Sequence, residues 1–261
     1  MTEKDNIQVF LDTLVVCDKE YGAECIRLVK YTSFYYDPAQ LDVGITKPRD
    51  NVLFRVGGSM QVAYEEACSG YRVAVLDFAD ALKPGGYPEL GAFTQEENMC
   101  RCSNLFAALT EHSEYYDYHR AGPDDIYTNG ALYVPGVTMF KDDVSYERIP
   151  DEQFDVIVCP SPSTACDSRI IYDRAAGIVK LAAARGVDTL ILGAWGCGAF
   201  GQDPYVIGKA FAKALNKYNH FIKVIFAVRP TVDDWGADNY EPLAQSFIHT
   251  YKKGAYVGQW Q

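Results

Sequence analysis

The chain has 261 residues, of which 48% are hydrophobic, and its formal net charge is −11. This charge argues against a nonspecific nucleic-acid surface, because binding to phosphate backbones needs clustered lysine and arginine. The sequence begins without the charged-then-apolar profile of a signal peptide, and its apolar runs fall short of the ~18 residues of a membrane span. We therefore expect an intracellular, cytoplasmic protein (or a nuclear one, if the source is eukaryotic) that has no membrane partner.

The first fifty residues predict a helical arm followed by a connection. Apolar residues recur at helical spacing over 5–30, with Asp5 as an N-cap and Gly22 as an interruption. The stretch "YTSFYYDPAQL" then predicts an aromatic, proline-containing connection. We assign residues 1–50 to an N-terminal helical extension packed on the core, and 51–261 to a single structural unit.

From residue 51 onward, predicted strands and helices alternate. Short apolar runs of the kind buried on both faces of a sheet predict the strands, which fall within 51–56, 72–79, 154–162, 188–196 and 221–228. Helical periodicity predicts the intervening elements at 60–68, 95–109, 168–186, 203–218 and 240–253. Gly186 is expected to be a C-cap. The stretch 110–150 is expected to be irregular, with a hairpin around "ALYVPGVTMF". This alternation predicts an α/β fold, a three-layer α/β/α sandwich.

Eight cysteines are scattered along the chain without a CxxC pair. Cys100 and Cys102 are too close together for a usual zinc knuckle. We expect reduced, buried thiols and neither a metal site nor a cofactor.

The stretch "KPGGYPELGAFTQEENMC" follows the predicted strand 72–79 and leads into a helix. Glycines at 85 and 86 let backbone N–H groups approach an anion, and a helix that begins near Gln95 adds its positive end. A second interpretation stays open from these residues alone, in which Pro-Gly-Gly is a tight turn and Gln95-Glu96-Glu97 merely complements the helix dipole.

A second glycine-rich loop, "LGAWGCGAFGQDP", has the same order of strand, turn and capped helix. Asp203 is expected to be the N-cap, with Pro204 in the first turn. Two such loops at one sheet edge could hold a diphosphate from two sides. Phe200 lies between glycines, where an aromatic ring can stack on a ligand, although a core phenylalanine is the alternative.

Together, "VLDFADALKPGG", "QEENMCRCSNLF", "VIVCPSP" and "LILGAWGCGAFGQDP" resemble the signature blocks of the poly(ADP-ribose) glycohydrolase family, most closely its bacterial type. The resemblance covers roughly residues 50–230. It implies a macrodomain-like fold with a mixed central sheet, and a glycosidase that releases ADP-ribose from poly(ADP-ribose) or a related linkage. The expected partners are ADP-ribose, its polymer and ADP-ribosylated macromolecules, bound by a monomer.

The same resemblance implies roles for individual residues. Glu97 is expected to be the catalytic acid/base, Glu96 to orient the substrate ribose, and Gln95 to support the loop. Phe200 is expected to pack against the ribose near the scissile bond. The diphosphate would be contacted by Gly85, Gly86, Gly196, Cys197, Gly198 and Ala199.

Two residues depart from the family pattern. Tyr87 stands where the family has a third glycine, and Asp80 stands where it has an asparagine. Both belong to the expected substrate-binding set, and both bear on substrate range and rate. A carboxylate at position 80 loses amide donation and adds negative charge near an anionic ligand.

Adjacent residues on a helix point ~100° apart, so Glu96 and Glu97 do not readily flank one bond as the paired carboxyls of most glycosidases do. We therefore favour a mechanism with Glu97 as a single acid/base. Two alternatives stay open: an ADP-ribose-binding module without catalysis, and a Cys197 nucleophile activated by a helix N-terminus.

Overall fold

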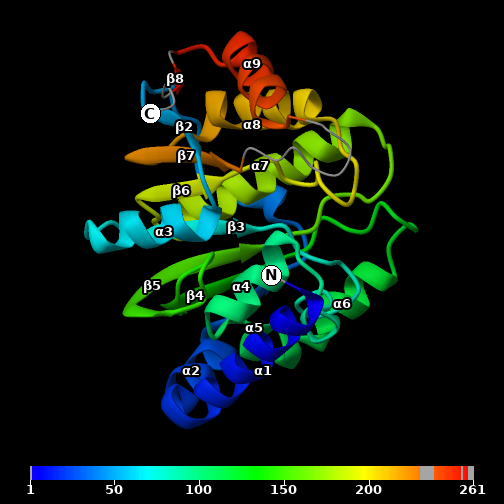
Figure 1. Ribbon diagram of the computed structural model, residues 1–261. Helices are drawn as coiled ribbons and strands as arrows, with labels where there is room; N and C mark the ends of the chain where they lie inside the picture. Colours follow the sequence, from blue (N-terminus) through cyan, green and yellow to red (C-terminus); the bar gives the residue numbers. More distant parts are fainter. Residues whose placement is uncertain (1, 230–237, 254, 258–261) are drawn as a thin grey trace.

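A computed structural model describes residues 2–229, 238–253 and 255–257. The strands form a single eight-stranded sheet in the order β1-β4-β5-β3-β6-β7-β2-β8, and most of this order can be followed from bottom to top in Figure 1. The bounds are β1 (Ser33–Tyr35), β2 (Val52–Val56), β3 (Val73–Asp77), β4 (Ala131–Lys141), β5 (Arg148–Val158), β6 (Thr189–Leu192), β7 (Lys223–Val228) and β8 (Ala255–Val257).

The sheet is mixed, as expected. Strands β5, β3, β6, β7, β2 and β8 run parallel to one another, whereas β4 runs antiparallel to both of its neighbours, β5 and the edge strand β1. The parallel strands need crossover connections, which are supplied by helices on the faces of the sheet. The helices are α1 (Glu3–Glu20), α2 (Gly22–Tyr31), α3 (Ser59–Cys68), α4 (Gln95–Cys102), α5 (Leu105–Glu111), α6 (Ser113–Arg120), α7 (Ser168–Ala184), α8 (Pro204–Tyr218) and α9 (Tyr240–Thr250).

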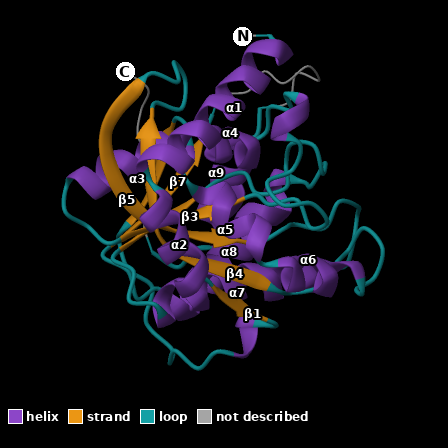
Figure 2. Ribbon diagram, turned by 90° about the horizontal axis from the view of Figure 1, so that it is seen from below, coloured by secondary structure: helices purple, strands orange, loops and turns teal. Residues whose placement is uncertain are grey.

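Alternate residues of the central strands enter two separate cores, which defines the three layers. In β3, Ala74 and Leu76 pack in the core beneath α7, α8 and α9. Val73 and Val75 of the same strand pack in the core beneath α1–α5. Helices lie on both sides of the strands in Figure 2. The α/β/α sandwich predicted from the sequence is therefore confirmed.

The N-terminal helices pack against the segments that carry the glycine loop. Asn6 donates its side-chain amide to Gly91 O at 3.2 Å, and Thr13 donates its hydroxyl to Arg101 O at 2.6 Å. Asp5 is not the N-cap of α1, because Thr2 caps the helix and Asp5 completes its capping box from the third helical position. The division at residue 50 stays a prediction.

The stretch 110–150 is more regular than predicted. It contains α6 and the strand β4, which pairs with β5. The Pro135-Gly136 dipeptide lies at a register shift within β4, rather than at the turn of a hairpin. Proline has no N–H for a sheet ladder, and a bulge tolerates that loss. Gly136, at φ +70°, donates its own N–H to Asp155 Oδ1 at 2.9 Å.

Three other features differ from the prediction. The expected helix over 95–109 is broken at residue 103, because the Ser103 hydroxyl donates to Met99 O and accepts from Leu105 N. The expected connection after α2 contains the edge strand β1. Gly186 follows the C-cap, Arg185, rather than forming it.

Candidate active site

Both glycine-rich loops leave the same edge of the sheet. Strands β3 and β6 are parallel neighbours, so the loops 78–94 and 193–203 that follow them begin side by side. The loops also touch at their bases, since a Cβ on Gly193 would lie 2.9 Å from the Phe78 ring. The carboxyl edge of a parallel sheet is where open α/β folds hold their ligands.

Gln95 ties the first loop to the end of its strand. Its Oε1 accepts from Phe78 N at 2.8 Å, while its Nε2 donates to Leu76 O at 2.9 Å. The same amide donates to Ser59 Oγ at 3.0 Å. These bonds hold the start of the loop against both β3 and α3.

The two glutamates hold other parts of the same loop. Glu96 Oε2 accepts from Asp80 N at 2.8 Å. Glu97 Oε1 accepts from Tyr87 N at 3.1 Å, and its Oε2 accepts from Thr94 N at 2.8 Å and from the Thr94 hydroxyl. Thr94 is the N-cap of α4, and Glu97 completes its capping box. The three consecutive side chains therefore clasp the loop at separate points.

Gly86 lies directly against the Glu97 carboxylate. A Cβ at this position would lie 2.3 Å from Glu97 Oε1, and the backbone has a φ of +69°. Both the contact and the left-handed conformation require glycine. Its neighbour Gly85 is similarly enclosed, by Phe106 and Cys100.

A third carboxyl, which the sequence reasoning missed, completes the site. Asp77 is fully buried at the end of β3, and neither of its oxygens has a hydrogen-bond partner within the described residues. Burial, together with the charge of Glu97, raises the pKa of Asp77 well above its usual range. Burial and then Asp77 raise the pKa of Glu96 in the same way, and Glu96 Oε1 also has no partner among those residues.

Such a cluster is costly to fold. Buried carboxyls that lack partners destabilise the folded state, and burial and like-charge neighbours that shift the pKa of a carboxyl are typical of active sites. A loop clasp alone could have been made with neutral amides. The sequence did carry one signal, an aspartate that ends an otherwise apolar strand, "VAVLD".

We expect Asp77→Asn to flatten the pH dependence of stability. A raised folded-state pKa means that the stabilisation is fully present below the unfolded pKa of ~3.9 and is lost as the pH rises through the folded pKa. In this window the wild-type free energy of unfolding should fall by up to ~1.4 kcal/mol per pH unit for this proton. Urea unfolding from pH 4 to 8 measures the difference, and a variant that parallels the wild type at every pH would contradict the prediction.

The second loop has spare backbone donors. A Cβ on Gly196, at φ +75°, would lie 2.1 Å from Ser161 Oγ, and Gln202 fixes the loop by donating Nε2 to Pro162 O at 2.7 Å. The three backbone N–H groups after Cys197, those of Gly198, Ala199 and Phe200, donate to no acceptor in the described part of the chain. Gly198 and Ala199 are exposed. Such a row of free N–H groups suits an anionic ligand.

Neither steric crowding nor a left-handed backbone explains why glycine occupies position 198. No described atom lies within 4 Å of the position that its Cβ would occupy, and its φ is outside the left-handed region. The space above this glycine is therefore open to a ligand. Phe200 is half-buried beside it, so it is positioned neither as a core residue nor as a fully exposed one.

The two departures from the family pattern fit the loop without strain. Tyr87 has a φ of −127°, so the backbone there does not need glycine, and its ring lies half-exposed beneath Lys83 Nζ at 3.9 Å. Asp80 Oδ1 accepts from Leu82 N at 2.7 Å and from Lys83 N at 3.0 Å. An asparagine could accept the same two bonds, so this turn does not require the charge.

The structure argues against a Cys197 nucleophile. Its side chain is buried, and burial raises the pKa of the thiol to about 12. A thiol in that state carries almost no thiolate near neutral pH. The general expectation of buried cysteines holds for Cys100, Cys102, Cys159 and Cys197, whereas Cys68 is exposed; all eight are free.

No group of three or more His, Cys, Asp or Glu side chains in the described residues is placed to hold a metal ion. Among the helices of the described ranges, none combines the length and apolar character needed to cross a membrane.

The fold and the paired loops define a class. A mixed sheet between two helical layers, with a glycine-lined site at the carboxyl ends of β3 and β6, is a macrodomain-like architecture.

Comparison with known proteins finds similarity to one family within this class. Residues 23–142 match the model of the family described as microbial-type PARG, catalytic domain. The chain superposes on poly(ADP-ribose) glycohydrolase from Thermomonospora curvata bound to the inhibitor ADP-HPD with a TM-score of 0.83, at 27% identity over 94% of this chain and 100% of the other. Poly(ADP-ribose) glycohydrolase from Deinococcus radiodurans in complex with ADP-ribose shares the fold, with a TM-score of 0.73 at 24% identity over 87% and 96% of the two chains. No curated protein matches the sequence. Over residues 23–142 the chain is therefore similar to the catalytic domain of the microbial-type poly(ADP-ribose) glycohydrolases.

Proposed function

We propose that this protein hydrolyses the ribose–ribose O-glycosidic bond of poly(ADP-ribose) and releases ADP-ribose. One observation carries the proposal. The buried Glu97 carboxylate lies in the first turn of α4, against Gly86 of the first glycine loop. The N–H groups of Gly198, Ala199 and Phe200, which are free within the described residues, lie in the loop that follows the neighbouring strand. An acid next to a diphosphate cradle is what this cleavage needs. The similarity to the glycohydrolase from Thermomonospora curvata supports the same activity.

In the mechanism that we propose, Glu97 gives its proton to the leaving ribose oxygen and the anomeric carbon becomes oxocarbenium-like. The Glu97 carboxylate then activates the attacking water. Glu96 accepts a hydrogen bond from the substrate ribose through Oε1, the oxygen without a partner in the described residues. Phe200 packs on the ribose near the scissile bond.

The diphosphate would lie between the two loops. Gly85 and Gly86 line it from one side, and the backbone of 196–199 lines it from the other, where the N–H groups donate to phosphate oxygens. Its negative charge stabilises the positive charge that develops on the sugar. We propose that the protein acts as a monomer inside the cell, on ADP-ribose polymers or on related ADP-ribosyl groups attached to macromolecules.

The direct test is to incubate the purified chain with poly- and mono-ADP-ribosylated protein and to follow free ADP-ribose by chromatography. We expect release from the polymer. Tight ADP-ribose binding by calorimetry, with no product from either substrate, would instead assign the protein as a non-catalytic ADP-ribose-binding module.

A further inference from the structure

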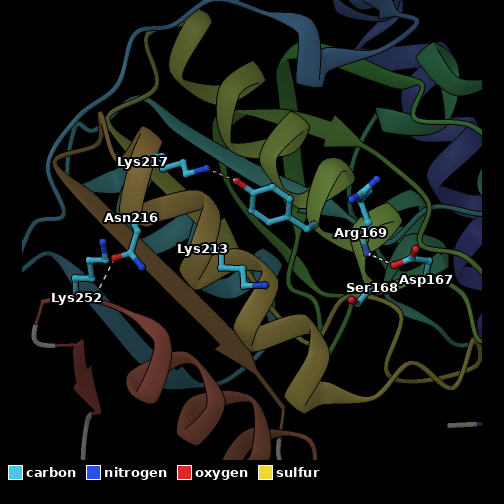
Figure 3. A pocket seen from close by; sticks show the side chains of 8 residues that line it. Asp167, Ser168, Arg169, Lys213, Asn216, Lys217 and Lys252 are labelled. Carbon is cyan, nitrogen blue, oxygen red and sulfur yellow. Dashed lines mark hydrogen bonds between the residues drawn. The ribbon is translucent and has the colours of Figure 1, made fainter.

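A cationic hollow lies on the α7–α8 face of the molecule. It has a volume of about 610 Å³. In Figure 3, α7 supplies one wall at its N-terminus and α8 supplies the other, with residue 252 beside α8. The lining residues are Asp167, Ser168, Arg169, Tyr172, Lys213, Asn216, Lys217 and Lys252.

Within the described residues, no ion pair neutralises the positive charges in this hollow. Arg169, Lys213, Lys217 and Lys252 take part in no ion pair among the residues that the structure describes. The one acidic lining residue, Asp167, caps α7 by accepting from Arg169 N at 2.8 Å. Four unpaired cations around one concavity are unexpected in a chain whose net charge is −11. Such a cluster attracts polyanions.

Hydrogen bonds and a lysine–ring contact, rather than ion pairs, hold part of the lining in place. Lys217 Nζ donates to the Tyr172 hydroxyl at 3.3 Å, and Lys213 Nζ lies 5.9 Å from the centre of the same ring. Asn216 accepts from Lys252 N at 2.8 Å, which fixes residue 252 beside α8. The half-buried Tyr172 ring adds an aromatic surface to the cations, a combination that suits a base joined to phosphates.

The hollow is connected to the second glycine loop. The segment 159–167 leads from β5 into α7. Ser161 of this segment packs against Gly196, and Thr164 O accepts from Gln202 Nε2 at 3.0 Å. Asp167 and Arg169, which line the hollow, follow only a few residues later, so one short segment joins the second glycine loop to the wall of the hollow.

The geometry points to a second binding site in this hollow, for the diphosphate of an ADP-ribose unit of the polymer whose end occupies the glycine loops. This inference rests on the proposed function. The side chains of Lys213 and Lys217 contact the phosphate oxygens, and Tyr172 offers its ring to the adenine. The site thus favours long chains over single ADP-ribose groups.

The test compares Lys213→Glu/Lys217→Glu with the matched pair Lys19→Glu/Lys47→Glu, which changes the net charge equally at exposed lysines that form no ion pair in the described residues. All variants are made in a Glu97→Gln background so that the polymer stays intact. Fluorescence anisotropy then measures affinity for ADP-ribose, for an oligo(ADP-ribose) of defined length, and for a single-stranded RNA of equal charge.

We expect Lys213→Glu/Lys217→Glu to weaken oligo(ADP-ribose) binding by roughly tenfold and to lower the slope of log affinity against log salt by about 1–2. ADP-ribose binding should stay unchanged. An equal loss in the Lys19/Lys47 pair, or no loss in either, overturns the inference. Equal binding of RNA with the same loss overturns the assignment to an ADP-ribose chain. Hydrolysis by the wild type tests the proposed function separately, because the binding comparison does not depend on turnover.

Discussion

Glu97→Gln is expected to lower the rate of ADP-ribose release by about 10²–10⁴-fold, the range that general acid–base catalysis supplies. The amide cannot give up a proton as an acid, nor can it activate water. Glutamine also disturbs the cap of α4, because its NH₂ group faces a donor where a carboxylate oxygen had accepted. A stability loss of about 1 kcal/mol should accompany the loss of rate.

Thr94→Ala separates the two effects. It removes the side-chain cap of α4 and leaves the Glu97 carboxylate in place. We expect a similar loss of stability by thermal melting, with far more activity than Glu97→Gln retains. A Glu97→Gln protein that turns over at the wild-type rate, while Glu96→Gln does not, would assign the acid to Glu96, whose Oε1 has no partner among the described residues.

Gly86→Ala has the second largest expected effect. The new methyl group would lie 2.3 Å from Glu97 Oε1, so either the loop or the carboxylate must move. A displacement of about 1 Å at a reacting group can cost roughly 10²-fold in rate. The left-handed backbone adds a penalty of about 1–2 kcal/mol for any L-residue. The free energy of unfolding and the rate should therefore fall together, as measured by urea unfolding and product release.

Gly198→Ala is the matched control, since it makes the same chemical change in the other loop. No described atom crowds that position, so its stability should change by less than about 0.5 kcal/mol. Its effect should appear as weaker substrate binding, with a raised KM. If both alanine variants lower stability equally, the predicted difference in crowding between Gly86 and Gly198 is wrong.

The layers of the fold could be predicted because they depend on local patterns. Strands such as "VAVLD" are apolar on both faces, and capped amphipathic helices follow them. What the sequence did not reveal depends on partners far along the chain. The strand β1 exists only because β4 pairs with it, and the Pro135-Gly136 bulge is defined by its register against β5. A three-residue strand such as β8 is too short for any periodicity to be seen.

The same distinction between local patterns and distant partners applies to the candidate active site. The glycines and the Gln-Glu-Glu run could be recognised as one motif, because their spacing is carried by the sequence itself. The burial of Asp77 could not, since it comes from α4 and the neighbouring strands closing over the end of β3. The hydrogen bonds from residues 95, 96 and 97 to the loop could not be predicted either. The sequence of an acidic helix start is the same whether or not its side chains bond to a preceding loop.

The two loops differ in how their backbone donors are used, and this difference bears on how the protein can evolve. In the first loop, the N–H groups of Phe78, Asp80 and Tyr87 are already engaged by the Gln-Glu-Glu side chains. A substitution there changes folding and chemistry at once, so few will be neutral. The N–H groups of 198–200 are engaged by nothing in the described chain. New specificities are thus expected to arise at residues 198–200 of the second loop, where a substitution breaks no hydrogen bond of these N–H groups within the described chain.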